Sequence, residues 1–320
     1  AMEQGADVRQ LAVFDDAVKA MEGTLGTDMT PQLRAVFGSI TTYQNIRLLP
    51  LALFSSLVDA AGIKVRGGTW GEATSSFFRG LKELFTTDKD HKYDIARAAG
   101  AINIAGDVQV VSDMYSSQFM SPGLKKLNEL FFKYNGMESW NRSMRTSASA
   151  AAANFLQRHA FEPTENSERY LRELNIKRSD INNDANGNLI LNDKVKTAIN
   201  TWVDQAILRP NAALRPIYMS DPNWILVSHL KQYTYLFQQV ILNRVYSELK
   251  QGNYDPAFGL MSYLPVIIMS DMARAILTPG SGDDHEDWEF EDYLWRGVQR
   301  AGFFGPGQMV LDSGADLRYG

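Results

Sequence analysis

The twelve residues from Asn182 to Asp193, NNDANGNLILND, have the spacing of a calcium-binding loop. An EF-hand loop places oxygen ligands at positions one, three, five, seven and twelve, and a glycine at position six for its sharp turn. Gly187 stands at position six here, and Leu189 at the apolar position eight. The candidate metal ligands that this count gives are Asn182, Asp184, Asn186, Asn188 and Asp193.

The types of these ligands fit less well than their spacing. Position one is usually Asp and position twelve is the bidentate Glu, but this chain has Asn182 and Asp193 there. Because only Asp184 and Asp193 carry charge, we expect any Ca²⁺ affinity to be weak. An Asn/Gly turn that leads into a short strand over Leu189–Leu191 explains the same residues without a metal. Both interpretations stay open, and no other cofactor is expected.

The histidines and glycines offer no recognisable catalytic set. The four His lie far apart at positions 91, 159, 229 and 285, no GxSxG is present, and HEDWE lacks the second His of a zincin helix. The glycine-rich stretch from Gly62 to Ala73 matches neither GxxxxGK[ST] nor GxGxxG, so we interpret it as a plain loop. We therefore expect no enzyme. An enzyme whose distant residues converge in the fold is the alternative.

The elements that position these residues are predicted to be helices. The chain has 320 residues, 45% of them hydrophobic, which suffices for a real core. Nearly every long segment repeats its apolar residues at the 3.6-residue helical period. The predicted fold is all-α, a large multi-helix bundle-like domain with at most a minor β-hairpin near Leu189–Leu191. We expect an N-terminal helical region, 1–160, and a C-terminal one, 161–320, in one continuous unit.

A long helix from Pro222 to Lys250 is expected to organise the C-terminal region. Asp221 and Pro222 are typical of a helix start, and Lys250 with Gly252 of a helix end. The prolines at 210, 216 and 222 predict an extended connector before this helix, with Trp224 buried beneath it.

The segment from Leu124 to His159 predicts two helices separated at Asn135–Gly136. On the second, the small residues of SASAAAA allow a neighbouring helix to approach closely. The same face is expected to carry Trp140, Met144, Ala148, Ala151 and Phe155. Basic residues between Lys125 and Arg158 fit either a basic patch or ordinary solvated helix faces.

The net charge and hydropathy of the chain limit the classes of partner that we expect it to bind. The net charge is −5, with a pI of about 5.5, so no specific nucleic-acid binding is expected. No signal-peptide pattern opens the sequence, and we expect it to begin within a longer protein. The apolar runs Leu48–Val58 and Leu264–Ile276 are shorter than a membrane span and are interpreted as buried core helices, with transient membrane contact as the alternative.

Four segments in order resemble the large helical domain of tailed-phage polyvalent and internal virion (DNA-ejection) proteins. They are FFKYNGMESWNRSMRTSASAAA, the stretch from WVDQAILRPNAALRPIYMSDP to VILNRV, the helix around Tyr263–Leu277, and DYLWRGVQRAGFFGPGQMVLD. The RPxxxSDP connector and the RAGFFGP turn are the most specific parts. The resemblance covers roughly Ile40 to Asp312.

The resemblance implies a non-catalytic structural module of a bacteriophage protein. Such proteins travel with DNA from the phage head into the host, and their helical domains have no assigned catalytic residues. The implied partners are other parts of the parent protein and other virion proteins. The implied location is the virion, and then the host cell envelope or cytoplasm.

Overall fold

The structure is a computed structural model, and it describes residues 8–22, 30–48, 59–85, 122–134, 136–208, 216–220, 224, 235–266, 268–269, 291–292 and 295. These residues form helices and turns without a strand, and an isolated β-bridge joins Asn183 to Leu189. The prediction of an all-α fold is confirmed. The bridge is all that forms of the minor hairpin expected next to Leu189–Leu191.

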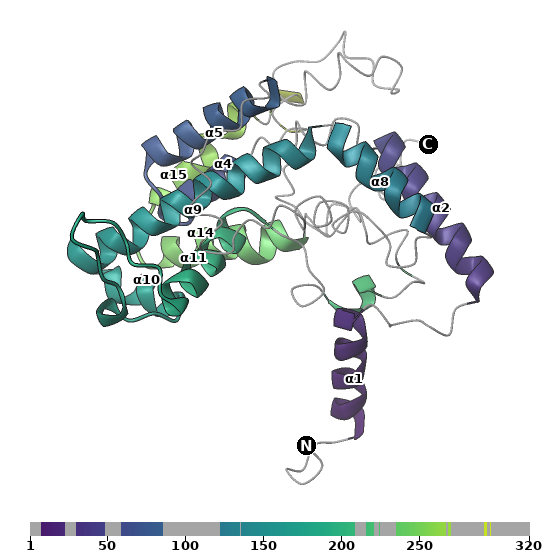
Figure 1. The fold of residues 1–320 in the computed structure, drawn as a ribbon, viewed down its shortest axis with the longest axis horizontal. Helices are drawn as coiled ribbons and strands as arrows, with labels where there is room; N and C mark the ends of the chain where they lie inside the picture. The colour runs from purple at the N-terminus through teal and green to yellow at the C-terminus, as the bar shows by residue number, and fades with distance from the viewer. Residues whose placement is uncertain are drawn as a thin grey trace.

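Helix α9 (Met137–Phe161) lies at the centre of the larger buried cluster, with α4 (Asp59–Val65), α5 (Trp70–Phe85), α10 (Ser167–Glu173) and α11 (Asp193–Ala206) packed around it (Figure 1). It follows Gly136, whose φ of 83° is a left-handed conformation that glycine adopts without strain. The break predicted at Asn135–Gly136 is thus confirmed. The predicted buried face of this helix is also confirmed. Its side chains are at most 1% exposed: Trp140, Met144, Ala148, Ala151 and Phe155.

Two glycines let helices approach closely in this cluster. At Gly80 of α5, an added Cβ would lie 2.6 Å from Met144 Cε. At Gly62 of α4, it would lie 1.8 Å from the carbonyl oxygen of Ala206 in α11. The space beside Gly62 is filled by the backbone of Ala206, which cannot move aside as a side chain can. Only glycine, which has no side chain, therefore fits at position 62.

The interpretation of Gly62–Ala73 as a loop is wrong for most of its length. Gly62 to Val65 complete α4, and α5 begins at Trp70, so a short turn remains between them. The glycine at 62 serves helix packing and not a turn. A reciprocal cap starts α5: Thr69 Oγ1 accepts from Glu72 N–H (3.1 Å), and Glu72 Oε2 accepts from Thr69 N–H (2.7 Å).

A second buried cluster joins the π-helix η7 (Phe237–Leu242), α14 (Asn243–Lys250) and α15 (Asp255–Met261) to Val65 and Leu208. As predicted, α14 ends at Lys250, and Gly252 follows with a φ of 77°. Helix α15 was not predicted. It begins with Asp255–Pro256, the same pair of residue types that predicts a helix start at Asp221–Pro222.

The π-helix differs from the regular α-helix expected there, and the spacing of its apolar residues gives the reason. Phe237, Ile241 and Val245 are buried and recur every four residues. Four residues overshoot one turn of an α-helix, which has 3.6, and fall short of one turn of the wider π-helix. Following a π-turn with an α-helix therefore keeps the three side chains on one face.

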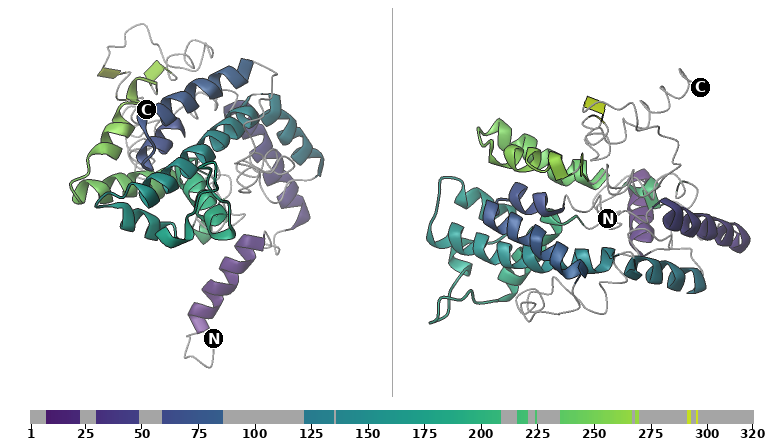
Figure 2. Two further views of the ribbon diagram at one scale, coloured as in Figure 1. Left: turned by 60° about the vertical axis from the view of Figure 1, so that its left-hand side comes forward. Right: turned by 90° about the horizontal axis from the view of Figure 1, so that it is seen from above.

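Three helices lie away from these clusters. Helices α2 (Pro31–Leu48) and α8 (Pro122–Tyr134) pack against each other, and α1 (Val8–Glu22) projects outward from its contact with the short 3₁₀ helix η4 (Ile217–Ser220) (Figure 2). Val13 and Phe14 of α1 are 58% and 68% exposed, so these two apolar side chains are not covered by the described part of the chain.

The prediction that Trp224 is buried is wrong, because this side chain is 57% exposed. The buried cluster is filled instead by Trp140 and Trp202, which sit on helix faces with apolar neighbours at helical spacing. The other structural predictions for 49–58, 86–121, 225–234 and 270–290 lie outside the described residues. Met269, in the apolar run expected to be buried, is 68% exposed. No helix within the described ranges is long and apolar enough to cross a bilayer.

Candidate functional site

The predicted calcium loop folds as a turn closed by Asp184. One oxygen of its carboxylate, Oδ1, accepts from the backbone N–H groups of Asn186 and Asn188, both at 2.8 Å. The other, Oδ2, accepts from Asn188 Nδ2 at 3.2 Å. These hydrogen bonds, that of the Asn188 backbone first, lower the pKa of Asp184. The carboxylate thus stays ionised and holds the Asn/Gly turn that the sequence offered as the alternative to a metal loop.

The structure places four of the five candidate ligands in this exposed turn and the fifth on a helix. Asn182, Asp184, Asn186 and Asn188 are exposed in the turn, whereas Asp193 is the first residue of α11. Asp193 Oδ1 lies 3.9 Å from Lys196 Nζ. No group of three or more His, Asp or Glu in the described ranges is arranged to hold a metal ion. Ca²⁺ binding at this loop stays a prediction.

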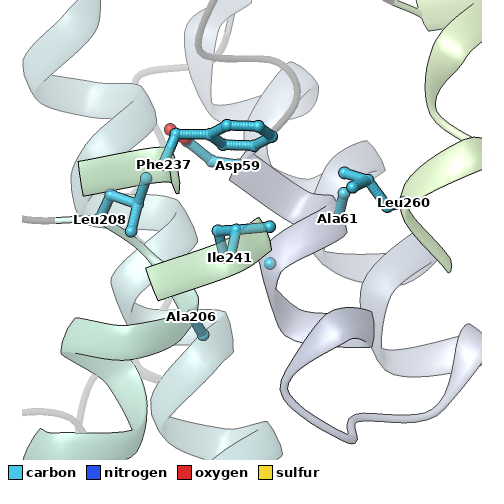
Figure 3. Close-up of a pocket in the computed structure, with 8 residues that line it drawn as sticks. Asp59, Ala61, Ala206, Leu208, Phe237, Ile241 and Leu260 are labelled. Atoms are coloured by element: carbon cyan, nitrogen blue, oxygen red, sulfur yellow. The ribbon is translucent and has the colours of Figure 1, made fainter. Parts of the chain in front are cut away.

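A small apolar cavity lies where the two buried clusters meet (Figure 3). Its volume is about 10 Å³, close to the space that one water molecule needs. One ionisable residue, Asp59, stands among its lining residues, which are Asp59, Ala61, Gly62, Ala206, Leu208, Phe237, Ile241 and Leu260. The cavity is too small for a substrate.

The densest group of charges in the described chain surrounds Glu248 on α14. This side chain is 1% exposed. Arg169 of α10 binds both of its oxygens, Nη1 to Oε1 at 2.8 Å and Nη2 to Oε2 at 2.9 Å. Oε2 also accepts from Asn253 Nδ2 at 2.8 Å and from the Tyr170 hydroxyl at 3.2 Å. Burial opposes the charge, but the Arg169 and Asn253 bonds and nearby Arg244 leave the pKa of Glu248 below its ordinary value.

A second carboxylate extends this group to the turn after α4. Glu173 Oε2 accepts hydrogen bonds from Arg244 Nη1 at 2.7 Å and from Arg66 Nη1 at 3.2 Å. Burial of Arg66, and then repulsion from Arg244, lower its pKa to about 9, with Glu173 acting against them. Arg66 is therefore still charged at neutral pH. We call these five residues the arginine–glutamate network: Arg66, Arg169, Glu173, Arg244 and Glu248.

The network connects the turn after α4 with α10 and α14 and has no free base. Each oxygen of Glu248 is bound by cations or donors, so the carboxylate cannot readily accept a proton from a substrate. Two pairs within the network, Arg169–Glu173 and Arg244–Glu248, are four residues apart and visible in the sequence. The contacts between helices, such as Arg169 to Glu248, join residues 79 apart and have no local signal.

His159 is the histidine that the structure describes, and it lies between α9 and α10. Its ring centroid is 4.3 Å from that of Phe155 and 5.1 Å from that of Tyr170. Nδ1 lies 2.8 Å from Ser167 Oγ. Burial, and then Arg158, lower the pKa of His159 to about 4, so the ring is neutral at pH 7. This His–Ser pair is not positioned for nucleophilic catalysis, because Ser167 is only 2% exposed.

Two basic residues of α9, Arg145 and Arg158, bind different neighbouring segments. Arg145 Nη2 binds Asp204 of α11 at 2.8 Å. Arg158 Nη1 lies 3.3 Å from Glu72 of α5, and its Nη2 donates to the carbonyl of Gly67 at 3.1 Å. Both guanidinium groups therefore bind neighbouring helices of the same chain.

No family model, curated protein sequence or solved structure matches this chain.

Proposed function

We propose that this chain is a non-catalytic helical module of a large phage-encoded protein, carried in the virion or delivered with the DNA into the host. It acts through packing and protein contacts. Its partners are other parts of the parent protein and other virion proteins. The resemblance of four ordered sequence segments to tailed-phage virion proteins supports the phage assignment.

The observation that carries the non-catalytic part of the proposal is the saturation of Glu248. A catalytic carboxylate needs an open face toward a substrate and a pKa matched to proton transfer. Glu248 is instead enclosed, and two guanidinium groups, an amide and a phenol surround it. Its pKa is also lowered, which opposes a role as a general acid. Such an arrangement fixes helices relative to one another.

Mass spectrometry of purified virions tests the assignment to the particle. Peptides from the described helices, for example from α9 and α14, are expected in virions of the phage that encodes this sequence. If the protein accumulates only in the infected cytoplasm, the proposal fails and an intracellular role takes its place. The purified chain is also expected to show no hydrolase, nuclease or nucleotidyl-transfer activity, with or without divalent metal.

A weak Ca²⁺-binding interaction module is the second candidate, favoured by the ligand spacing from Asn182 to Asp193. A ligand that binds only the folded chain raises its melting temperature. If the chain is a non-catalytic module that binds no metal, its melting temperature should be the same in millimolar CaCl₂ and in millimolar MgCl₂. A rise specific to Ca²⁺ that disappears in Asp193→Asn would support the calcium module, because this substitution removes the position-twelve carboxylate but leaves the turn around Asp184.

A further inference from the structure

Among the residues that the structure describes, none gives His159 an acidic partner. On α9 the nearest charge is Arg158, which is bound to Glu72 of α5. From α10, His159 meets the uncharged Ser167 and Tyr170. On the far side of Phe155, α11 contributes the uncharged Trp202, at 5.9 Å between ring centroids. Glu162 and Glu165, in the connection to α10, are exposed to solvent.

One of the two aromatic neighbours of His159, Tyr170, already interacts with two cations. The guanidinium carbons of Arg169 and Arg244 lie 4.5 and 5.5 Å from the centroid of the Tyr170 ring. The nearby carboxylates of the network, Glu173 and Glu248, are bound by Arg66, Arg169 and Arg244. A positive charge on His159 would therefore gain no free carboxylate from this network, and it would share the Tyr170 ring with two guanidinium groups.

The hydrogen bond of His159 also suits a neutral ring. Ser167 Oγ accepts from the backbone N–H of Thr164 at 2.7 Å, so its own hydrogen can be donated to His159 Nδ1. Protonation of Nδ1 would reverse this bond. The Ser167 hydrogen would then have to turn toward Thr164 Oγ1, which is 3.1 Å away.

We propose that His159 is an acid-sensitive latch between α9 and α10. While the imidazole is neutral, it holds α10 against α9. When it takes a second proton, the α9–α10 corner opens, and α10 separates from α9 together with the Tyr170 ring that leads to the arginine–glutamate network. This inference does not depend on the proposed function.

The pH range of the opening follows from linkage. The open state binds the proton at the ordinary His pKa of about 6.5, whereas the closed state binds it only near about 4. The closed state is thus fully stable above about pH 6.5, and its opening constant rises about tenfold per pH unit as pH falls toward 4. Between pH 6.5 and pH 5.0 Glu248 stays ionised, because its pKa lies below the ordinary value of 4.5. Loss of charge on Glu248 therefore does not account for opening in this interval.

Amide hydrogen exchange of the full chain tests the latch. After correction for the intrinsic exchange rate, the opening constant of peptides covering 155–174 is expected to rise about 15-fold between pH 6.5 and pH 5.0, because the open state is already half protonated at pH 6.5 and gains about tenfold per unit only below it. His159→Gln retains a side-chain amide and does not titrate, so its rise should be less than threefold. His285→Gln is the matched control and should keep the full rise.

Two results would overturn the proposal. One is an equal rise in His159→Gln and in the unaltered chain, and the other is no rise in the unaltered chain. If His159→Gln does not fold at pH 7, NMR of ¹³C-labelled histidine in the unaltered chain decides instead, with His159 assigned by elimination using His91→Gln, His229→Gln and His285→Gln. The latch requires that His159 stay neutral at pH 5.5 in the closed state. Titration of the closed state near pH 6.5 would exclude it.

Discussion

At the scale of single residues, Gly62 shows how a pattern typical of a loop can serve a helix contact. Its substitution by Ala should destabilise the fold, because the new Cβ would meet the carbonyl oxygen of Ala206, which is backbone and cannot turn aside. Overpacking of this kind costs about 1–3 kcal/mol or more. We expect Gly62→Ala to lower the free energy of unfolding by at least about 2 kcal/mol in chemical denaturation.

The control for Gly62 is Gly123 on α8. A Cβ there meets nothing within 4 Å. Gly123→Ala should be neutral or stabilise the chain by up to about 1 kcal/mol, because Ala has the higher helix propensity and restricts the unfolded chain. Equal denaturation midpoints for the two variants would contradict the close approach of α4 and α11.

Glu248 should be the most costly charged residue to truncate in the described chain. Glu248→Ala would leave Arg169 and Arg244 without their buried counter-charge, and breaking a buried pair on one side costs about 3–5 kcal/mol. Thermal and urea unfolding of this variant measure the loss. Glu168→Ala, on an exposed position of α10, should stay within about 0.5 kcal/mol of the unaltered chain. A loss at Glu248 no larger than that at Glu168 would show that the network is unimportant for stability.

At the scale of elements, the π-helix η7 is tied to the spacing of Phe237 and Ile241. Deleting the exposed Gln239 removes one residue from the wide turn, so that Phe237 rotates away from the second buried cluster. Far-UV circular dichroism should keep its helical form, while stability falls by about 3 kcal/mol or more, as for truncation of a core Phe. Gln239→Ala should leave stability nearly unchanged. A deletion variant of full stability would show that the π-turn does not set this register.

The elements also show what the sequence could predict. The prediction of the buried face of α9, from Trp140 to Phe155, was correct because such a face depends only on one helix and its 3.6-residue period. Helix α15 was missed although Asp255–Pro256 signals its start, because its seven residues are too few for a clear period. The arginine–glutamate network could not be predicted, because its contacts join three stretches of chain far apart in sequence. Trp224 was placed wrongly because size alone does not determine burial.

At the scale of the whole molecule, the distribution of buried residues predicts an order of local stability. Amides in the buried parts of α9 and α11, around Ala152 and Ile199, should exchange slowest, because opening them exposes the larger cluster. Amides of α1, with Val13 and Phe14 exposed, should exchange fastest among the described helices. Exchange in α1 as slow as in α9 would mean that α1 is covered in solution by a partner or a second copy.

Lys64 has a consequence for chemical labelling. It is 5% exposed, its methylenes lie against Gly259 of α15, and its ammonium forms an ion pair with Asp255. An amine-reactive reagent should therefore acylate Lys250 and Lys194 at once and reach Lys64 only when α15 leaves α4. When it is followed by mass spectrometry over time, the modification of this one lysine would report how often α15 leaves α4 in the purified protein.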